Sequence, residues 1–101
     1  MEKYLGISVL SDLYKCNSEL ITDIKSIEKI LLDAVQIGKW EITECCFQEY
    51  DHGLCGVIIG KDSHIAIYTY PEYNYASLIL YSNTEDWRPI YTYIVGQLES
   101  P

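Results

Sequence analysis

The chain has 101 residues, 49% of them hydrophobic and 22% charged, so it is long enough for one globular domain and too apolar to be intrinsically disordered. Fifteen acidic against seven basic side chains give a formal net charge of −8, which repels phosphate backbones and argues against a nucleic-acid-binding protein. The same negative field favours small cationic ligands over free nucleotides.

The first half of the chain predicts a strand followed by one long helix. Residues 4–14 mix β-forming side chains in loose alternation, and Gly6 marks either a bulge or a close backbone approach. Asn17 or Ser18 is the expected N-cap of the helix, and Gly38 is the expected C-cap. Between them, apolar side chains recur at the three- and four-residue spacing of an amphipathic helix. They are Leu20, Ile21, Ile24, Ile27, Ile30, Leu31, Ala34 and Val35.

The second half predicts a series of strands and a closing helix. Turn-forming residues at 51–53 and 60–62 divide it, and Pro71 ends a strand because proline has no N–H to donate to a ladder. Residues 83–86 have the residue types of a helix cap and first turn. The expected elements are strands at 40–50, 54–59, 63–70 and 75–81 and a helix from residue 87 or 89 to 98.

This order of elements predicts an α+β fold, a two-layer sandwich of a mainly antiparallel sheet with helices packed on one face. We expect residues 1–101 to form a single domain, because no repeat or linker interrupts the sequence. A lone sheet covered on one face leaves the other face exposed. We therefore expect a homo-oligomer, either a dimer or a trimer.

The four cysteines, Cys16, Cys45, Cys46 and Cys55, lack the spacing of metal ligands, so we expect no metal site. They are most simply small buried side chains in a reducing cytosol. No basic and apolar leader opens the chain, and no apolar run approaches the ~20 residues of a membrane span. The sequence thus predicts a cytoplasmic protein without a membrane partner. Other candidates for burial on the 40–50 strand are Trp40, Ile42 and Phe47.

Residues 62–76 read DSHIAIYTYPEYNYA and concentrate the polar and aromatic side chains of the chain. This stretch resembles the central motif of the prokaryotic S-adenosylmethionine decarboxylases, roughly Glu-Ser-His-(Ile/Leu)-x-Ile-His-Thr-Trp-Pro-Glu-Tyr-Gly-Tyr-Ala. The Gly-x-Ser-Gly turn of that family appears as GLCG at residues 53–56, and its early Leu-Tyr-x-Cys pattern as LYKC at residues 13–16. The resemblance covers nearly the whole chain and implies the two-layer α+β fold of the family.

The resemblance also implies a self-cleavage site between Asp62 and Ser63. In the family, this serine attacks the preceding carbonyl, the chain splits, and the serine becomes a pyruvoyl group that binds the substrate as a Schiff base. A turn serine and a strand histidine assist cleavage, and a cysteine after the last strand donates a proton during turnover. This chain has Cys55, Tyr68 and Asn83 at those positions. A phenol and an amide are poor proton shuttles at neutral pH, so we expect both maturation and decarboxylation to be suppressed.

The part of the motif that holds substrate in the family is kept. Glu72 matches the glutamate that accepts hydrogen bonds from ribose hydroxyls. The tyrosines of residues 68–75 offer aromatic faces to an adenine ring or to a sulfonium cation. Asn83 has a simpler interpretation as a helix cap. The candidate substrate-binding residues are Glu72, Tyr70, Tyr73, Tyr75 and Asn83.

The leading hypothesis is a lyase that cleaves S-adenosylmethionine (SAM), or its adenylated conjugate SAM-AMP, a second messenger of CRISPR antiviral defence. The products would be homoserine lactone and methylthioadenosine or its adenylated form, with no cofactor. The candidate catalytic residues are Asp62, Ser63 and Tyr68. One alternative is a pyruvoyl-dependent SAM decarboxylase of polyamine biosynthesis, processed between Asp62 and Ser63. The other is a catalytically dead paralogue that binds ligand or regulates an active enzyme.

Overall fold

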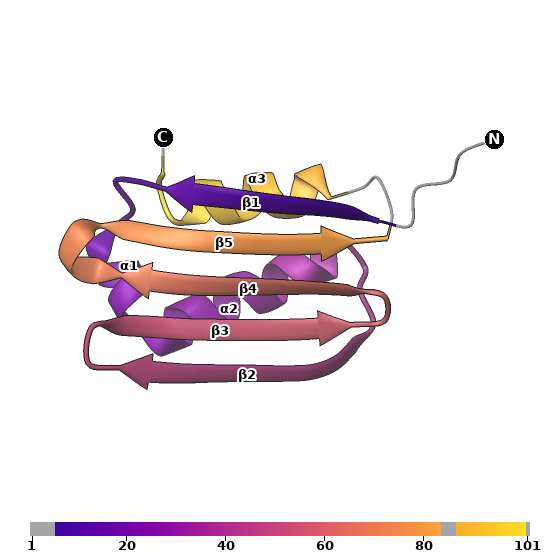
Figure 1. The fold of residues 1–101 in the computed structure, drawn as a ribbon, viewed down its shortest axis with the longest axis horizontal. Helices are drawn as coiled ribbons and strands as arrows, with labels where there is room; N and C mark the ends of the chain where they lie inside the picture. The colour runs from indigo at the N-terminus through magenta and orange to yellow at the C-terminus, as the bar shows by residue number, and fades with distance from the viewer. Residues whose placement is uncertain (1–5, 84–86, 101) are drawn as a thin grey trace.

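The chain folds into a five-stranded antiparallel sheet with its α-helices on one face (Figure 1). This computed structural model describes residues 6–83 and 87–100. The strands lie in the order β1, β5, β4, β3, β2, which confirms the predicted two-layer α+β fold. The strands are β1 (Ile7–Leu13), β2 (Ile42–Tyr50), β3 (Gly53–Gly60), β4 (Ser63–Tyr70) and β5 (Tyr75–Ser82). The helices are α1 (Ser18–Thr22), α2 (Ile24–Ile37), α3 (Arg88–Gln97) and a short 3-10 helix, η1 (Pro71–Tyr73).

The predicted long helix is two helices, α1 and α2. Asn17 is the N-cap of α1, and its side-chain oxygen accepts hydrogen bonds from the backbone of Glu19 (2.9 Å) and Leu20 (3.3 Å). The prediction of a continuous helix is wrong at Asp23, where the backbone is extended at φ −99° and ψ 112°. The carboxylate of Asp23 accepts a 2.7 Å hydrogen bond from Ser26. Such local bonding lets a short polar side chain compete with the helical conformation.

The closing helix, α3, begins at Arg88 with Trp87 as its N-cap, and Pro89 lies in its first turn. Asn83 directly follows β5, so it is not the cap of this helix, and residues 84–86 of the predicted first turn lie outside the described residues. Within the described parts of the chain, no helix has the length and apolar character needed to cross a membrane.

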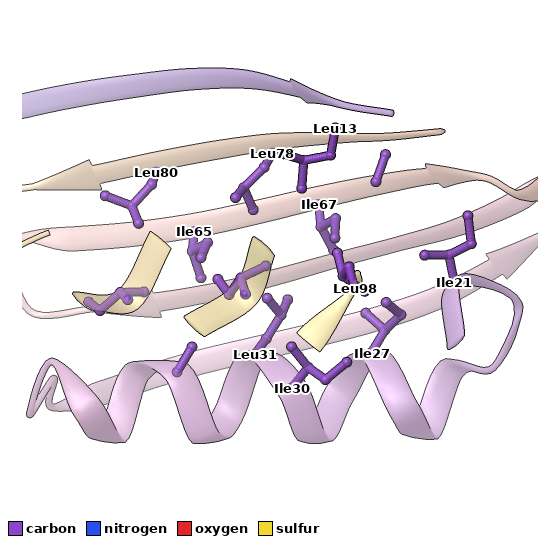
Figure 2. Packing of buried hydrophobic residues seen from close by; sticks show 14 of the residues in the cluster. Leu13, Ile21, Ile27, Ile30, Leu31, Ile65, Ile67, Leu78, Leu80 and Leu98 are labelled. Atoms are coloured by element: carbon purple, nitrogen blue, oxygen red, sulfur yellow. The ribbon is translucent and has the colours of Figure 1, made fainter. Parts of the chain in front are cut away.

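The core lies between the helix layer and the inner face of the sheet. In Figure 2, Ile27, Ile30 and Leu31 of α2 point toward Ile65 and Ile67 of β4. The helical spacing predicted for α2 is therefore confirmed, because the apolar residues at that spacing are the buried ones. Each fully buried apolar side chain contributes roughly 1.5–3 kcal/mol to folding. The buried residues are Leu13, Cys16, Ile21, Ile27, Ile30, Leu31, Ala34, Val35, Leu54, Ile58, Ile65, Ile67, Ala76, Leu78, Leu80, Ile90, Ile94 and Leu98.

The expected burial of the cysteines and of β2 is largely wrong. Cys16 is buried, but Cys55 is half-buried, and Cys45 and Cys46 are exposed. β2 is an edge strand at the end of the sheet, and Figure 1 shows α2 behind β3 and β4 instead. Side chains on an edge strand have a neighbouring strand on one side only, so they are less covered than those of the central strands. Ile42 is accordingly exposed, whereas Trp40 and Phe47 are half-buried against the core.

Thr69 of β4 connects β3 and α1 through hydrogen bonds of its buried side chain. Its buried hydroxyl accepts a 2.9 Å hydrogen bond from the backbone N–H of Leu54 and donates one of 2.9 Å to the carbonyl of Ile21. Both bonds join segments that are far apart in the sequence. The hydroxyl thereby fixes the end of the sheet at which β4 leads into η1.

Replacing Thr69 with valine keeps the shape of the side chain but leaves two buried backbone groups without this partner. We expect the free energy of unfolding to fall by about 2–4 kcal/mol, because each unsatisfied buried group costs about 1–3 kcal/mol. Urea denaturation measures the loss. Thr43→Val is the matched control, since the hydroxyl of Thr43 donates to the carbonyl of Ile59 at an exposed position. An equal loss in both variants would contradict this role of Thr69.

Candidate functional site

The outer face of the sheet carries the polar and aromatic side chains of the central motif. Along β4, residues alternate between the two faces, with Ser63, Ile65, Ile67 and Thr69 buried against the helices. The side chains of the intervening residues point to the open face, which no described helix covers. These outward residues are His64, Ala66, Tyr68 and Tyr70.

Four tyrosines form a pocket on this open face, at the end of the sheet next to η1. The pocket has a volume of about 520 Å³, within the range of small-molecule sites. The ring centroid of Tyr75 lies 5.7 Å from that of Tyr70 and 5.3 Å from that of Tyr14. We call this site the tyrosine pocket. It is lined by Tyr68, Tyr70, Tyr73, Tyr75, Ser77 and Ile79.

The turn between β4 and β5 fixes the pocket. Pro71 ends β4 as predicted, and Asn74 closes η1 in the left-handed conformation with φ 51°. The side-chain amide of Asn74 donates a 3.1 Å hydrogen bond to the carbonyl of Cys16, and the N–H of Cys16 donates one of 2.8 Å to the carbonyl of Asn74. Tyr73 and Tyr75 are thus presented from a turn that is anchored to the start of α1.

Tyr68 lies directly opposite Cys55 of β3, so the two side chains share the open face. The phenol is hydrogen-bonded to the thiol of Cys55, and this contact raises the pKa of Tyr68 above its ordinary value of 10.0. Tyr68 is therefore protonated at neutral pH and presents an O–H donor beside the pocket. The structure brings together two positions that the family motif assigns to a strand histidine and a turn serine.

Asp12 is a site residue that the sequence analysis missed. The hydroxyl of Tyr75 donates a 2.5 Å hydrogen bond to Oδ1 of Asp12, and this bond raises the pKa of Tyr75. Asp12 is also the cross-strand partner of Ser77 in the β1–β5 ladder. Alternation along β1 places Asp12 on the face opposite the buried Leu13, but the sequence does not reveal that β1 pairs with β5.

Glu72 lies beside the tyrosine pocket instead of in it. It is exposed in η1 and lines a neighbouring hollow of about 400 Å³ together with Tyr50 and His52. A third hollow, of about 240 Å³, is lined by Tyr50 and His52 and also by Tyr68 and Tyr70 of the tyrosine pocket. A ligand that fills the pocket can therefore extend along these tyrosines toward Glu72. Tyr50 and His52 were also missed, because they precede the motif by ten residues or more.

Asp62, Ser63 and Asn83 lie at the opposite end of the sheet. Ser63 is 7% exposed on the helix-facing side of β4 and pairs with Gly60 and Ser82. Asp62 precedes it in a turn with a left-handed φ of 63°. Five residues at a rise of about 3.3 Å each separate Ser63 from Tyr68 by roughly 17 Å along the strand. The structure thus does not bring these three residues to the tyrosine pocket within one chain.

Two other observations limit what the open face can do. His64 points outward, away from Ser63, and stacks on Tyr81 with ring centroids 5.7 Å apart. Residues 6–83 and 87–100 contain no group of three or more histidine, cysteine, aspartate or glutamate side chains placed to hold a metal ion. The chemistry of the described site therefore rests on phenols, a thiol, carboxylates and the imidazole of His52.

Comparison with known proteins gives a consistent set of relatives. The family model described as S-adenosylmethionine decarboxylase matches residues 7–101. An S-adenosylmethionine decarboxylase proenzyme of Moorella thermoacetica is 37% identical over 86 residues, which cover 84% of this chain and 69% of the relative. That of Sulfurisphaera tokodaii is 33% identical over 101 residues, covering 97% and 82%. The crystal structure of the Aquifex aeolicus adenosylmethionine decarboxylase superposes with a TM-score of 0.91 at 25% identity, covering 98% of this chain and 84% of that one.

Proposed function

The chain belongs to the S-adenosylmethionine decarboxylase family, and from this membership we propose that it is a lyase acting on SAM or SAM-AMP without a pyruvoyl group. The observation that carries the proposal is the tyrosine pocket, with Tyr68 and Cys55 paired beside it. These two side chains stand where the family motif has an imidazole and a hydroxyl. The proposal keeps the substrate of the family and changes the reaction.

The tyrosine pocket suits the sulfonium and adenosyl parts of such a substrate. Aromatic faces attract a cation by about 0.5–2 kcal/mol and also stack on adenine. Glu72, beside the pocket, offers two acceptor oxygens to ribose hydroxyls. SAM and SAM-AMP carry the same sulfonium and amino-acid tail, so the tyrosine pocket suits that part of either substrate.

The reaction needs positioning more than proton transfer. A carboxylate oxygen of the substrate attacks its own γ-carbon, the carbon–sulfur bond breaks, and the bonding electron pair stays on sulfur. The sulfonium becomes a neutral thioether, the carboxylate becomes a five-membered lactone, and no proton is exchanged. Holding the amino-acid tail in the folded-back conformation supplies much of the rate, since intramolecular reactions reach effective molarities of about 10⁵ M or more. In this proposal the O–H of Tyr68 orients the attacking carboxylate.

The residues around Ser63 do not fit the formation of a pyruvoyl group. Its cross-strand neighbours, Gly60 and Ser82, bring no imidazole to the Asp62–Ser63 bond. Cys55 and Tyr68 occupy the positions of the family's two processing residues, but they supply a thiol and a phenol in place of a hydroxyl and an imidazole. No step of the proposed lyase reaction therefore involves a pyruvoyl group.

A pyruvoyl-dependent decarboxylase is the second candidate. The relatives described above are named decarboxylase proenzymes. In this reaction Asp62 and Ser63 are the reacting residues, and the chain is split between them.

Product analysis tests the proposal. The purified protein is incubated with SAM and, separately, with SAM-AMP, and the products are separated and weighed by mass spectrometry. We expect homoserine lactone together with methylthioadenosine or its adenylated form. Release of carbon dioxide, with two fragments split at Asp62–Ser63, would establish the decarboxylase instead. A ligand-induced rise in melting temperature without any product would support the regulatory paralogue.

The variant Ser63→Ala separates the two reactions. The proposed lyase assigns no chemical step to Ser63, so we expect its kcat on SAM to stay within about twofold. A decarboxylase loses the precursor of its pyruvoyl group and with it essentially all turnover. The measurement is the initial rate of SAM consumption, with methylthioadenosine and carbon dioxide quantified separately and an intact-mass spectrum of the same preparation. Complete loss of turnover in the variant would contradict the proposed lyase.

A further inference from the structure

Asp12 is attached to the tyrosine pocket but has no role in the reaction proposed above. It projects from the open face of β1 and is paired with Ser77, which lines the pocket. Its carboxylate accepts the 2.5 Å hydrogen bond from the hydroxyl of Tyr75, another lining residue. Two separate contacts therefore place this anion at the rim of the pocket.

The charge of Asp12 is available to a ligand. The side chain is exposed, and over residues 6–83 and 87–100 it forms no ion pair with a lysine or arginine. The residues that line the pocket are tyrosines, a serine and an isoleucine, which carry no charge at neutral pH. The carboxylate of Asp12 thus places a negative charge at the mouth of an otherwise uncharged aromatic pocket.

The hydrogen bond to Asp12 also changes the electron density of the Tyr75 ring. The centroid of this ring lies 5.3 Å from that of Tyr14 and 5.7 Å from that of Tyr70. A phenol that donates its proton to a carboxylate has a more electron-rich ring, and such a ring attracts a cation more strongly. The carboxylate and the neighbouring faces therefore act on the same kind of ligand, a small organic cation.

Resting on the proposed function, we infer that Asp12 is the specificity residue that separates the cationic substrate from the neutral product. SAM carries its positive charge on sulfur, and cleavage leaves methylthioadenosine with an uncharged thioether. The attraction of Asp12 acts on the first sulfur and disappears when the carbon–sulfur bond breaks. The site then holds substrate and releases product, although both carry the same adenosyl group. Glu72 differs in this respect, because the ribose that it would bind is common to substrate and product.

Two stable ligands that differ near this charge provide the test. Sinefungin has a protonated amine close to the position of the sulfonium, and S-adenosylhomocysteine has a neutral thioether. Titration calorimetry gives the ratio of their dissociation constants for each protein. We expect the native protein to prefer sinefungin by about tenfold or more, and Asp12→Asn to lower this preference at least about threefold, leaving the part that the tyrosine faces supply. Asp12→Glu, which keeps the charge, should retain most of the preference.

Two control variants separate this effect from general ones. Glu44→Gln removes one negative charge from an exposed position on edge strand β2 of the same sheet, and we expect the ratio to remain unchanged. Glu72→Gln should weaken both ligands to a similar degree and so also leave the ratio unchanged. A native ratio near unity, or a ratio that Asp12→Asn does not alter, would overturn the inference.

The outcome is distinguishable from that of the lyase proposal. If the protein does not cleave SAM but Asp12→Asn lowers the preference for sinefungin, the cation specificity of Asp12 is supported and the lyase proposal is contradicted. If the protein cleaves SAM and Asp12→Asn does not change the ratio of the two dissociation constants, the lyase proposal is supported and the specificity role of Asp12 is contradicted.

Discussion

Replacing Tyr68 with phenylalanine is expected to lower kcat for cleavage of SAM about 10²- to 10³-fold while changing KM much less. The ring and its stacking surface remain, and only the O–H that orients the attacking carboxylate is lost. Removing one preorganised donor from an active site typically costs this much. Initial rates of methylthioadenosine formation across a range of SAM concentrations separate the effect on kcat from that on KM.

Tyr93→Phe is the matched control, because the hydroxyl of Tyr93 contacts Asp33 in the helix layer at 3.4 Å, on the other face of the sheet. Its kcat should stay within about twofold of the native value. Equal rates for Tyr68→Phe and Tyr93→Phe would contradict the role given to Tyr68. A large increase in KM at constant kcat would instead assign Tyr68 to binding alone.

The pH profile provides an independent readout of the same hydroxyl. The hydrogen bond to Cys55 raises the pKa of Tyr68 above 10.0, so the neutral phenol persists from pH 7 to beyond pH 9. Activity that depends on the O–H is present throughout this range and is lost as the pH rises through the raised pKa. Cys55→Ala removes the main cause of the shift, so the alkaline loss of activity should move to lower pH.

Gly53→Ala is expected to lower the free energy of unfolding by about 3 kcal/mol or more and to distort the tyrosine pocket. A methyl group at Gly53 would overlap the carbonyl oxygen of Thr69 and lie 3.4 Å from the ring of Pro71. A backbone oxygen cannot rotate away, so β3 must shift relative to β4. Tyr68 and Tyr70 flank Thr69 on β4, so the shift would change their positions relative to Cys55 of β3.

Gly96→Ala is a control that is expected to change the free energy of unfolding in the opposite direction. Gly96 lies near the end of α3, and an added methyl group would meet no atom within 4 Å. Alanine in a helix is favoured over glycine by about 0.5–1 kcal/mol, so this variant should be slightly more stable than the native protein. Thermal and urea denaturation measure whether Gly53→Ala lowers the stability and Gly96→Ala raises it. A Gly53→Ala protein as stable as the native one would contradict the close packing of β3 on β4.

Local patterns in the sequence predicted most of the fold. The spacing of Ile27, Leu31 and Ala34 gave the buried face of α2, and Asn17 and Gly38 cap the helical segment as expected. The close approach at Gly6 is also present, since the ring of Tyr81 occupies the place of a side chain there. These features depend on neighbouring residues along the chain, which periodicity and capping chemistry describe directly.

Features that depend on distant segments were not predictable in the same way. The exposure of Cys45 and Cys46 follows from the position of β2 at the edge of the sheet, which alternation does not specify. The contact between Asp12 and Tyr75 joins residues 63 positions apart and requires the β1–β5 pairing. The tyrosines of the motif do gather in one pocket, but the direction of Glu72 depends on how η1 turns away from β4.

The fate of the substrate carboxyl carbon tests the central proposal most directly. The purified native protein is incubated with SAM labelled with carbon-13 in its carboxyl group, and the label is followed by nuclear magnetic resonance. A lyase of the proposed kind moves the label into the carbonyl of homoserine lactone, with methylthioadenosine formed in equal amount. Label recovered as carbon dioxide or bicarbonate, with decarboxylated SAM as the other product, would contradict the account.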